Sequence, residues 1–288
     1  MWRCLTAWGA PCDGEHVEQL VVGLLAARGV VRDASGRAAE GFGLAGPQAL
    51  EIALHGKALM EDPQHDEVLR VRFAGPESPF ARVVPRPAVL ELDFLLGASL
   101  KRDGEGLPPL LDTRIAPIVF PQPNQRVAQL LVQRSDGPPF ELTRRAKEPA
   151  ATPDPADPAS ALDWQWWLTD GAREVALAPL RGEAYVTWIP RVPYVALADP
   201  ASAEERGFSQ PRAKLTLVPD GGQPLEIEVG ERTPDGGLWV RSPQVLSRID
   251  AASARMLLPE LDELIDDTRD NQWDAALRKA LAEGRLPR

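Results

Sequence analysis

Alternating apolar positions predict a sheet of short antiparallel strands in the second half of the chain. The segments AKLTLV (213–218) and LEIEVG (225–230) place an apolar residue at every second position, which is the period of a strand with one buried face. Pro-Asp-Gly-Gly follows each segment, at 219–222 and 234–237, and these residues favour tight turns. Residues 127–145 predict a further hairpin that turns at an Asp-Gly pair. We therefore expect an antiparallel meander.

Other segments carry the spacing of amphipathic helices. Apolar residues follow each other at three- and four-residue intervals in 14–29 and in 251–265, and a terminal helix is predicted at 271–288. A shorter helix is predicted around 180–187. Residues 199–207 begin with Asp-Pro and end with Gly, which favours a single helical turn. Together these elements predict an α+β fold in which helices pack on a mainly antiparallel meander sheet.

An internal repeat organises the chain. Residues 30–54 resemble residues 194–218 without a gap. A constant shift of 164 carries Val31, Ala34, Ala39, Glu40, Gly43, Pro47 and Ala49 onto Val195, Ala198, Ala203, Glu204, Gly207, Pro211 and Ala213. The Gly-x-x-x-Pro pair is informative because both residues restrict the backbone. The fold is therefore expected to contain two tandem copies of one unit.

Weaker matches set the expected boundaries of the two copies. Leu5-Thr6 matches Leu168-Thr169, so a strand is expected to open each copy, and Asp112-Thr113-Arg114 matches Asp267-Thr268-Arg269. We expect a first unit at 1–118, lacking its opening hairpin and carrying extra residues in the loop at 57–67. We expect a second unit at 119–288, with a Pro/Ala linker at 147–161 and the C-terminal helix.

The motifs, in their order, resemble a known family. Phe42, Gly43, Leu44 and Pro47 form an F-G-L-x-x-P motif, and the strands VLELD and VLSRID and an Asp-Thr-Arg segment follow the alternating strands of each copy. This pattern resembles the bacterial domain-of-unknown-function family 4340 over nearly the whole chain. The resemblance implies tandem copies, the cell envelope on its periplasmic side, a membrane anchor, and an accessory role beside ABC-transporter components. No catalytic residues are established for that family.

Charge and hydropathy narrow the expected partners. The net charge of −10 disfavours binding to phosphate backbones, so no nucleic-acid partner is expected. The longest apolar run, residues 20–27, is shorter than the roughly 20 residues of a membrane helix. We therefore expect no direct membrane insertion by this chain. Members of the family are anchored in the membrane, and this chain shows no such segment. A cytoplasmic location is therefore an alternative to the envelope.

The chain carries no recognisable catalytic or metal-binding motif. His16, His55 and His65 lack the spacing of a zinc site, and no Gly-x-Ser-x-Gly or phosphate-binding loop is present. The acidic loop at 61–67 lacks the calcium-loop pattern and is interpreted as a charged hairpin tip. The spacing of the two cysteines permits a disulfide without establishing one. We therefore expect no catalytic residue, no cofactor and no metal.

The tryptophans are the remaining candidates. On a strand, Trp164 and Trp166 share one face and Trp167 lies on the other, and Trp188 follows the helix predicted at 180–187. We interpret these four residues as an interface between the two copies, with core packing and ligand binding by ring stacking as alternatives.

The expected function is a non-catalytic scaffold or interaction protein of the envelope. Its expected partner is a protein, a membrane transporter or another envelope component. Two alternatives stay open. One is a glycan- or peptide-binding module that uses the strand at 164–169. The other is a hydrolase whose carboxylate pair the sequence does not reveal.

Overall fold

The computed structural model describes residues 2–46, 48–56, 67–93, 95, 107, 110–116, 126–147 and 163–265. The chain divides into two compact units. The first comprises Met1–Cys4 and Pro11–Leu111, and the second comprises residues 5–10 and Asp112–Arg288. Both units combine helices with antiparallel sheets, so the predicted α+β class is confirmed.

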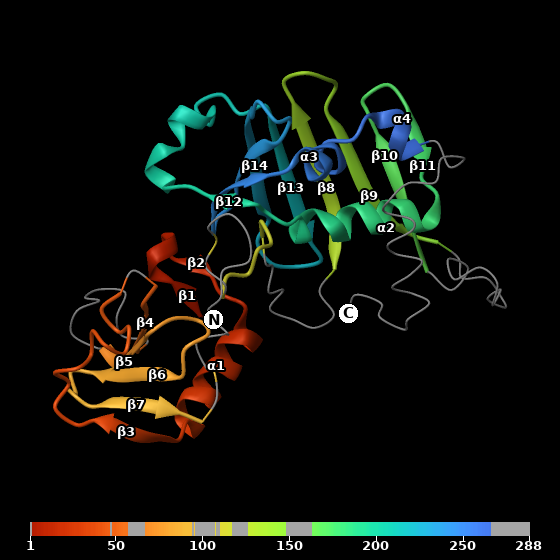
Figure 1. The fold of residues 1–288 in the computed structure, drawn as a ribbon. Coiled ribbons are helices and arrows are strands. Elements are labelled where there is room, and N and C mark those ends of the chain that lie inside the picture. Colours follow the sequence, from red (N-terminus) through yellow and green to blue (C-terminus); the bar gives the residue numbers. More distant parts are fainter. Residues whose placement is uncertain are drawn as a thin grey trace. The chain divides into compact units, whose positions relative to one another are not determined.

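In the described residues, the main elements of the first unit are one α-helix and a five-stranded antiparallel sheet (Figure 1). The helix is α1 (Gly14–Ala26). The strands in chain order are β3 (Gly29–Asp33), β4 (Leu50–His55), β5 (Glu67–Phe73), β6 (Phe80–Val84) and β7 (Val89–Leu92). Their order in the sheet is β3-β7-β6-β5-β4, so the chain runs as a meander from β4 to β7 and β3 lies beside the last strand.

Helix α1 begins at a capping residue and packs on the sheet. The side chain of Asp13 accepts hydrogen bonds from the backbone amides of Glu15 and His16, which satisfies two of the free N–H groups at the helix start. Leu20 of α1 packs against Val71 and Phe73 of β5 in the core cluster of this unit. The helix predicted at 14–29 is confirmed over Gly14–Ala26.

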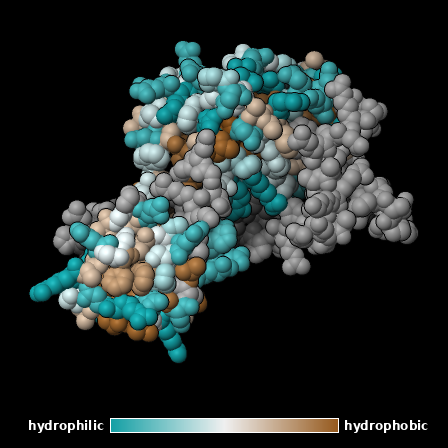
Figure 2. Space-filling model, viewed as in Figure 1, coloured by the Kyte–Doolittle hydropathy of each residue, from teal (hydrophilic) through white to brown (hydrophobic). Residues whose placement is uncertain are grey.

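The first unit also exposes apolar side chains. Val22 and Leu25 of α1 and Val30 and Val31 of β3 are all more than half exposed. Figure 2 shows hydrophobic atoms at the surface of this unit, whereas the hairpin ends of the second unit are mainly hydrophilic.

The second unit consists of a nine-stranded antiparallel sheet with short helices (Figure 1). Its strands are β8 (Val127–Arg134), β9 (Phe140–Ala146), β10 (Trp164–Thr169), β11 (Glu174–Ala176), β12 (Ala196–Leu197), β13 (Ala213–Pro219), β14 (Leu225–Arg232), β15 (Leu238–Arg241) and β16 (Leu246–Ile249). The sheet order is β11-β10-β9-β8-β13-β14-β15-β16-β12. The predicted hairpin and meander are confirmed, but β12 is shorter than the strand expected at 193–197.

Helices cover one face of this sheet. They are α2 (Pro179–Trp188), which continues into the 3-10 helix η5 (Ile189–Arg191), then α3 (Ala251–Leu257) and α4 (Leu261–Ile265). The hydroxyl of buried Tyr185 donates to the carbonyl oxygen of Leu257 at 2.9 Å, which ties α2 to α3. The single helix predicted at 251–265 is wrong, because the chain leaves helical geometry at Leu258 and Pro259 follows.

A similar turn follows β3 in the first unit and β12 in the second unit. It spans residues 37–46 in the first unit, and the 3-10 helices η6 (Pro200–Ser202) and η7 (Glu204–Arg206) in the second. Gly43 and Gly207 close these turns at φ of 80° and 82°, which is left-handed backbone that favours glycine. The helical turn predicted at 199–207 is confirmed.

These turns cover the sheet face opposite to the helices. The ring centroids of Phe42 and Phe80 lie 4.8 Å apart. Phe80 and Ala81 are consecutive in β6 and therefore lie on opposite faces of the sheet, with Ala81 in the core beneath α1. In the second unit Phe208 packs with Leu246, on the face opposite to Val240. Each sheet is therefore a middle layer between a helix and a turn.

The predicted opening strand of the first copy is wrong at Leu5-Thr6. These residues lie in the 3-10 helix η1 (Leu5–Ala7), between the short strands β1 (Arg3–Cys4) and β2 (Ala10–Pro11). Leu5 is 60% exposed, whereas Leu168 is fully buried in β10. Residues 148–161 of the Pro/Ala linker, residues 57–66 of the extra loop with His65, and the predicted C-terminal helix lie outside the described residues.

Acid sensitivity is expected from the turn carboxylates. The pKa of Asp33 is lowered, first by the backbone amide of Ala38 and then by the hydroxyl of Ser35. The pKa of Asp170 is lowered mainly by the guanidinium of Arg173. A carboxyl whose folded pKa lies below its unfolded value stabilises the fold above the unfolded pKa, and this contribution is lost as pH falls through the folded pKa.

The urea midpoint should therefore be nearly constant from pH 7 to about 5 and should fall below about pH 4, near the ordinary carboxyl pKa. Urea titrations followed by circular dichroism test this. Asp33→Asn should weaken the acid dependence. A midpoint that rises on acidification below pH 4 would refute the assignment.

Candidate functional site

Two of the candidate tryptophans meet one carboxylate of helix α2. Trp164 and Trp166 lie on the same face of β10, two residues apart. The indole Nε1 of each donates a hydrogen bond to Oε2 of Glu183, at 3.1 Å and 2.9 Å. The other oxygen of Glu183 accepts from the hydroxyl of Thr187, one helical turn further on, at 3.5 Å. Glu183 therefore fastens α2 to β10.

The contact between α2 and β10 is close because the helix presents a glycine. A Cβ atom at Gly182 would lie 2.4 Å from Cβ of Trp166 and 2.5 Å from its Cγ. Trp166 is only 1% exposed and is among the largest buried side chains of the described residues. The Trp166 ring thus fills the core of the second unit.

Cations surround the outer tryptophan of this pair. The guanidinium of Arg126 lies 4.2 Å from the ring centroid of Trp164, and that of Arg144 lies 5.7 Å away. Burial lowers the pKa of Arg144, the charge of Glu183 opposes this, and the charge of Arg126 adds to it. Arg144 also forms an ion pair with Asp220. The tryptophan pair, Glu183, Arg126 and Arg144 are called the tryptophan–glutamate cluster below.

Trp167 lies on the opposite face of the same strand. It stands beside Thr143 of β9 and Ala176 of β11 and is partly exposed. The guanidinium of Arg145 lies 5.1 Å from its ring centroid and is also paired with Glu174. The predicted alternation of the strand is confirmed, so the three neighbouring tryptophans do not form one continuous aromatic platform.

Of the four candidate tryptophans, only Trp164 and Trp166 share a hydrogen-bond partner. Trp188 is partly buried at the end of α2, six residues beyond Gly182 in the same helix. Sequence reasoning missed Glu183, Arg126 and Arg144. No motif marks them, and the only available signal was the position of Glu183 on the helix predicted at 180–187.

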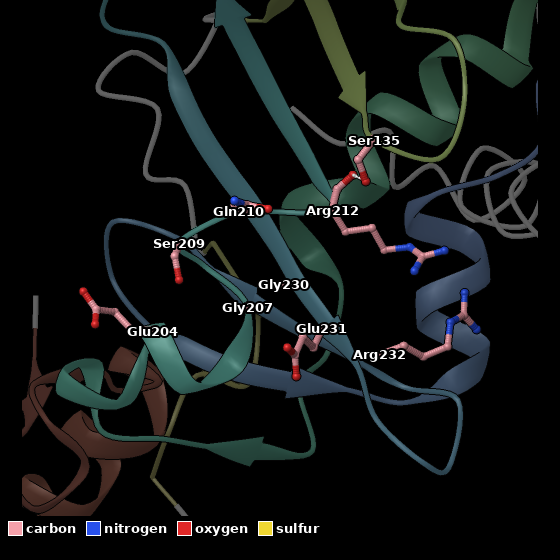
Figure 3. Close-up of a pocket in the computed structure, with 9 residues that line it drawn as sticks. All are labelled: Ser135, Glu204, Gly207, Ser209, Gln210, Arg212, Gly230, Glu231 and Arg232. Carbon is pink, nitrogen blue, oxygen red and sulfur yellow. Dashed lines mark hydrogen bonds between the residues drawn. The ribbon is translucent and has the colours of Figure 1, made fainter.

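A shallow polar pocket lies elsewhere in the second unit (Figure 3). Its volume is about 560 Å³, and η7, the following loop and β14 line most of it. The lining glycines permit close packing, since a Cβ at Gly230 would lie 2.3 Å from the carbonyl oxygen of Arg206. Figure 3 shows the side chains of Arg212 and Arg232 pointing away from Glu204.

The two arginines of this pocket have structural partners, and Arg232 donates to the carbonyl oxygen of Gly236 at 3.4 Å. Arg212 pairs with Asp136, and its carbonyl oxygen accepts a hydrogen bond from the hydroxyl of Ser135 at 3.1 Å. Burial alone would raise the pKa of Asp136, but the guanidinium groups of Arg134 and Arg212 lower it below its usual range. These contacts hold the ends of β8 and β13 together.

The remaining sequence candidates have simple environments. His16 is exposed at the start of α1, with Nδ1 3.1 Å from a carboxylate oxygen of Asp13. Cys4 and Cys12 are free thiols. A hydrogen bond with Cys4 and partial burial raise the pKa of the Cys12 thiol, which disfavours its nucleophilic thiolate form. In the part of the chain that the structure describes, no three His, Cys, Asp or Glu residues gather as metal ligands.

No helix within the described ranges has the length and apolar character needed to cross a membrane. Comparison with known protein families, curated proteins and solved structures finds no match to this chain.

Loss of the Glu183 carboxylate should destabilise the second unit. Glu183→Ala leaves two indole donors without their acceptor, and an unsatisfied buried donor costs about 1–3 kcal/mol. We expect the free energy of unfolding to fall by about 2–3 kcal/mol, measured by urea titration followed by tryptophan fluorescence. Glu183→Gln keeps an acceptor oxygen and should lose less. Equal losses in both variants would contradict the fastening role.

Proposed function

We propose that the chain consists of two copies of one α+β unit. The five strands that follow α1 are ordered β4-β5-β6-β7-β3, and the five that follow α2 are ordered β13-β14-β15-β16-β12. Both ladders are antiparallel throughout, and in both the strand after the helix lies beside the last strand of the meander. An identical order of five strands in two unrelated sheets would be an unusual coincidence.

The turns support the same correspondence residue by residue. The amide of Gly43 donates to the carbonyl oxygen of Glu40 at 2.9 Å, and the amide of Gly207 donates to that of Glu204 at 3.3 Å. The amides that follow each glycine donate to the carbonyl oxygens of Ala39 and Ala203, at 3.1 Å and 3.4 Å. The constant shift of 164 found in the sequence therefore preserves these backbone hydrogen bonds.

We further propose that this is a non-catalytic scaffold or interaction protein. The observation that carries this proposal is the tryptophan–glutamate cluster. Trp164 and Trp166, which the sequence offered as binding candidates, donate to Glu183 and so hold α2 on β10. A duplicated structural unit of this kind supplies sheet surfaces and edges for a protein partner. The proposed envelope location and transporter partner rest on the resemblance to family 4340.

Affinity capture after mild cross-linking in native cells tests this function. We expect a transporter subunit or another envelope protein to be recovered repeatedly with the wild-type chain. Capture should persist with Glu204→Gln, a change in the shallow pocket that a non-catalytic role does not need. Recovery of no envelope or transporter component would overturn the proposal.

A second candidate function is glycan or peptide binding around Trp167. It is favoured by one observation, namely that Trp167 is partly exposed beside the Arg145–Glu174 pair. Binding of soluble polysaccharides would change tryptophan fluorescence, and Trp167→Ala would remove the change. An unchanged spectrum across a polysaccharide panel would exclude this alternative for the glycans tested.

A further inference from the structure

Strands β4 and β13 are each the first strand in the orders β4-β5-β6-β7-β3 and β13-β14-β15-β16-β12, but they differ in their neighbours. β13 pairs with β14 on one side and with β8 on the other. β4 pairs with β5, and no other strand among the described residues pairs with its second edge. Among the described residues, the sheet of the first unit therefore ends at the second edge of β4, called the free edge below, at the place where the second unit continues its sheet.

Strand β8 shows what a neighbour contributes at this place. It pairs with β13 in antiparallel register, with Val132 opposite Leu215 and Leu130 opposite Leu217. All four side chains are at most 1% exposed. The added strand thus extends the apolar face of the sheet and completes the burial of β13.

The same face of β4 is incompletely buried. Leu50 and Ile52 pack against the core cluster that contains Phe73, but both remain only partly buried. This is the expected condition of a core-facing residue that lacks a neighbour on one flank. No strand among the described residues pairs with the backbone N–H and C=O groups on the free edge, and an unpaired edge is a template for pairing.

The sequence of β4 keeps this edge usable. Edge strands are commonly protected by shortness, by proline or lysine, or by bulges. β4 has six residues, contains neither proline nor lysine, and is irregular only between Leu54 and His55. The other edges are less suitable, since β11 has three residues, β12 has two, and β3 is irregular between Val31 and Asp33.

We propose that the free edge of β4 binds an extended polypeptide strand in antiparallel orientation. The bound strand places apolar side chains at alternate positions beside Leu50 and Ile52, as β8 does beside β13. Main-chain hydrogen bonds supply the affinity, and the alternate side chains supply the specificity. This inference rests on the proposed interaction role and identifies the surface that performs it.

A fluorescent peptide with the β8 sequence, VAQLLVQR, is the probe. Titrated with the full chain, it should show saturable anisotropy with a dissociation constant below about 1 mM. A peptide of the same composition without the alternation should bind at least tenfold more weakly. No saturation of the VAQLLVQR signal up to about 1 mM would overturn the proposal.

Backbone methylation of the peptide tests strand pairing without altering the protein. Successive N–H groups of a strand point to opposite edges, so two peptides methylated at alternate residues block opposite edges. One should bind like the unmodified peptide, and the other should lose more than tenfold in affinity. Equal affinities would show that the contact is not a strand pairing and would overturn the proposal.

Hydrogen exchange locates the contact. We expect the peptide to protect amides within residues 51–54. Protection of β3, β11 or β12 instead would overturn the assignment to β4. A concentration-dependent dimer that the peptide dissociates would make a second copy the occupant and would also overturn the proposal. Failure of the peptide leaves the envelope-capture result unaffected, so the two proposals fail separately.

Discussion

Trp166→Ala should lower the free energy of unfolding of the second unit by about 3–5 kcal/mol, the range for removing a buried aromatic side chain. The ring is 1% exposed, packs beneath Gly182 and donates to Glu183, so its loss creates a cavity and removes one tie to α2. Urea unfolding followed by far-ultraviolet circular dichroism measures the change.

The adjacent Trp167→Ala is a matched control for this substitution. It removes the same side chain from the same strand, but from the face opposite to α2, where the ring is partly exposed beside Arg145. We expect a loss of about 1 kcal/mol, mainly from the cation–π contact and partial burial. Similar losses in the two variants would show that the alternation does not decide which tryptophan is structural.

Gly182→Ala should also destabilise the fold, although alanine is the better helix former by about 1 kcal/mol. Its Cβ would lie 2.4 Å from Cβ of Trp166, an atom next to the backbone that cannot move independently. The helix or the strand must shift, and overpacking of this kind costs about 1–3 kcal/mol or more. We expect a net loss of about 2 kcal/mol by urea titration.

Gly14→Ala provides the comparison for Gly182→Ala. Gly14 begins α1, and no atom lies within 4 Å of an added Cβ. The substitution should change the free energy of unfolding by less than about 0.5 kcal/mol. If Gly182→Ala is equally harmless, the close approach of α2 to β10 is not a requirement of the fold.

Local signals in the sequence predicted most of the elements in the described residues. The alternation in β13 and β14, the Pro-Asp-Gly-Gly turns and the Asp-Pro start of the turn at Pro200 each depend on a few neighbouring residues. The glycines at 43 and 207 were also recognisable as turn residues, because left-handed backbone favours glycine. Such features need no knowledge of the rest of the chain.

Features that depend on distant contacts were not predictable in the same way. Leu5 and Leu168 are the same residue type before a threonine, yet one is exposed in η1 and the other is buried in β10. The pairing of β8 with β13 joins segments far apart in the chain. The role of Glu183 follows from the same kind of long-range packing, since its acceptor function exists only once α2 lies on β10.

The two units have the same order of five strands and differ in the strands added to it. The second carries β8–β11 beside its meander and closes the core around Trp166, whereas the ladder of the first ends at β4 among the described residues. These differences, rather than the shared ladder, distinguish the surfaces that each unit offers to a partner.

The most direct test of the two-copy account is the strand order of each sheet, measured by cross-strand nuclear Overhauser effects in the full chain. We predict contacts between Val31 and Leu90 in the first sheet and between Leu197 and Ser247 in the second. These contacts would place the strand after each helix beside the last strand of its meander. Contacts of β3 with β4 instead, or different orders in the two sheets, would contradict the account.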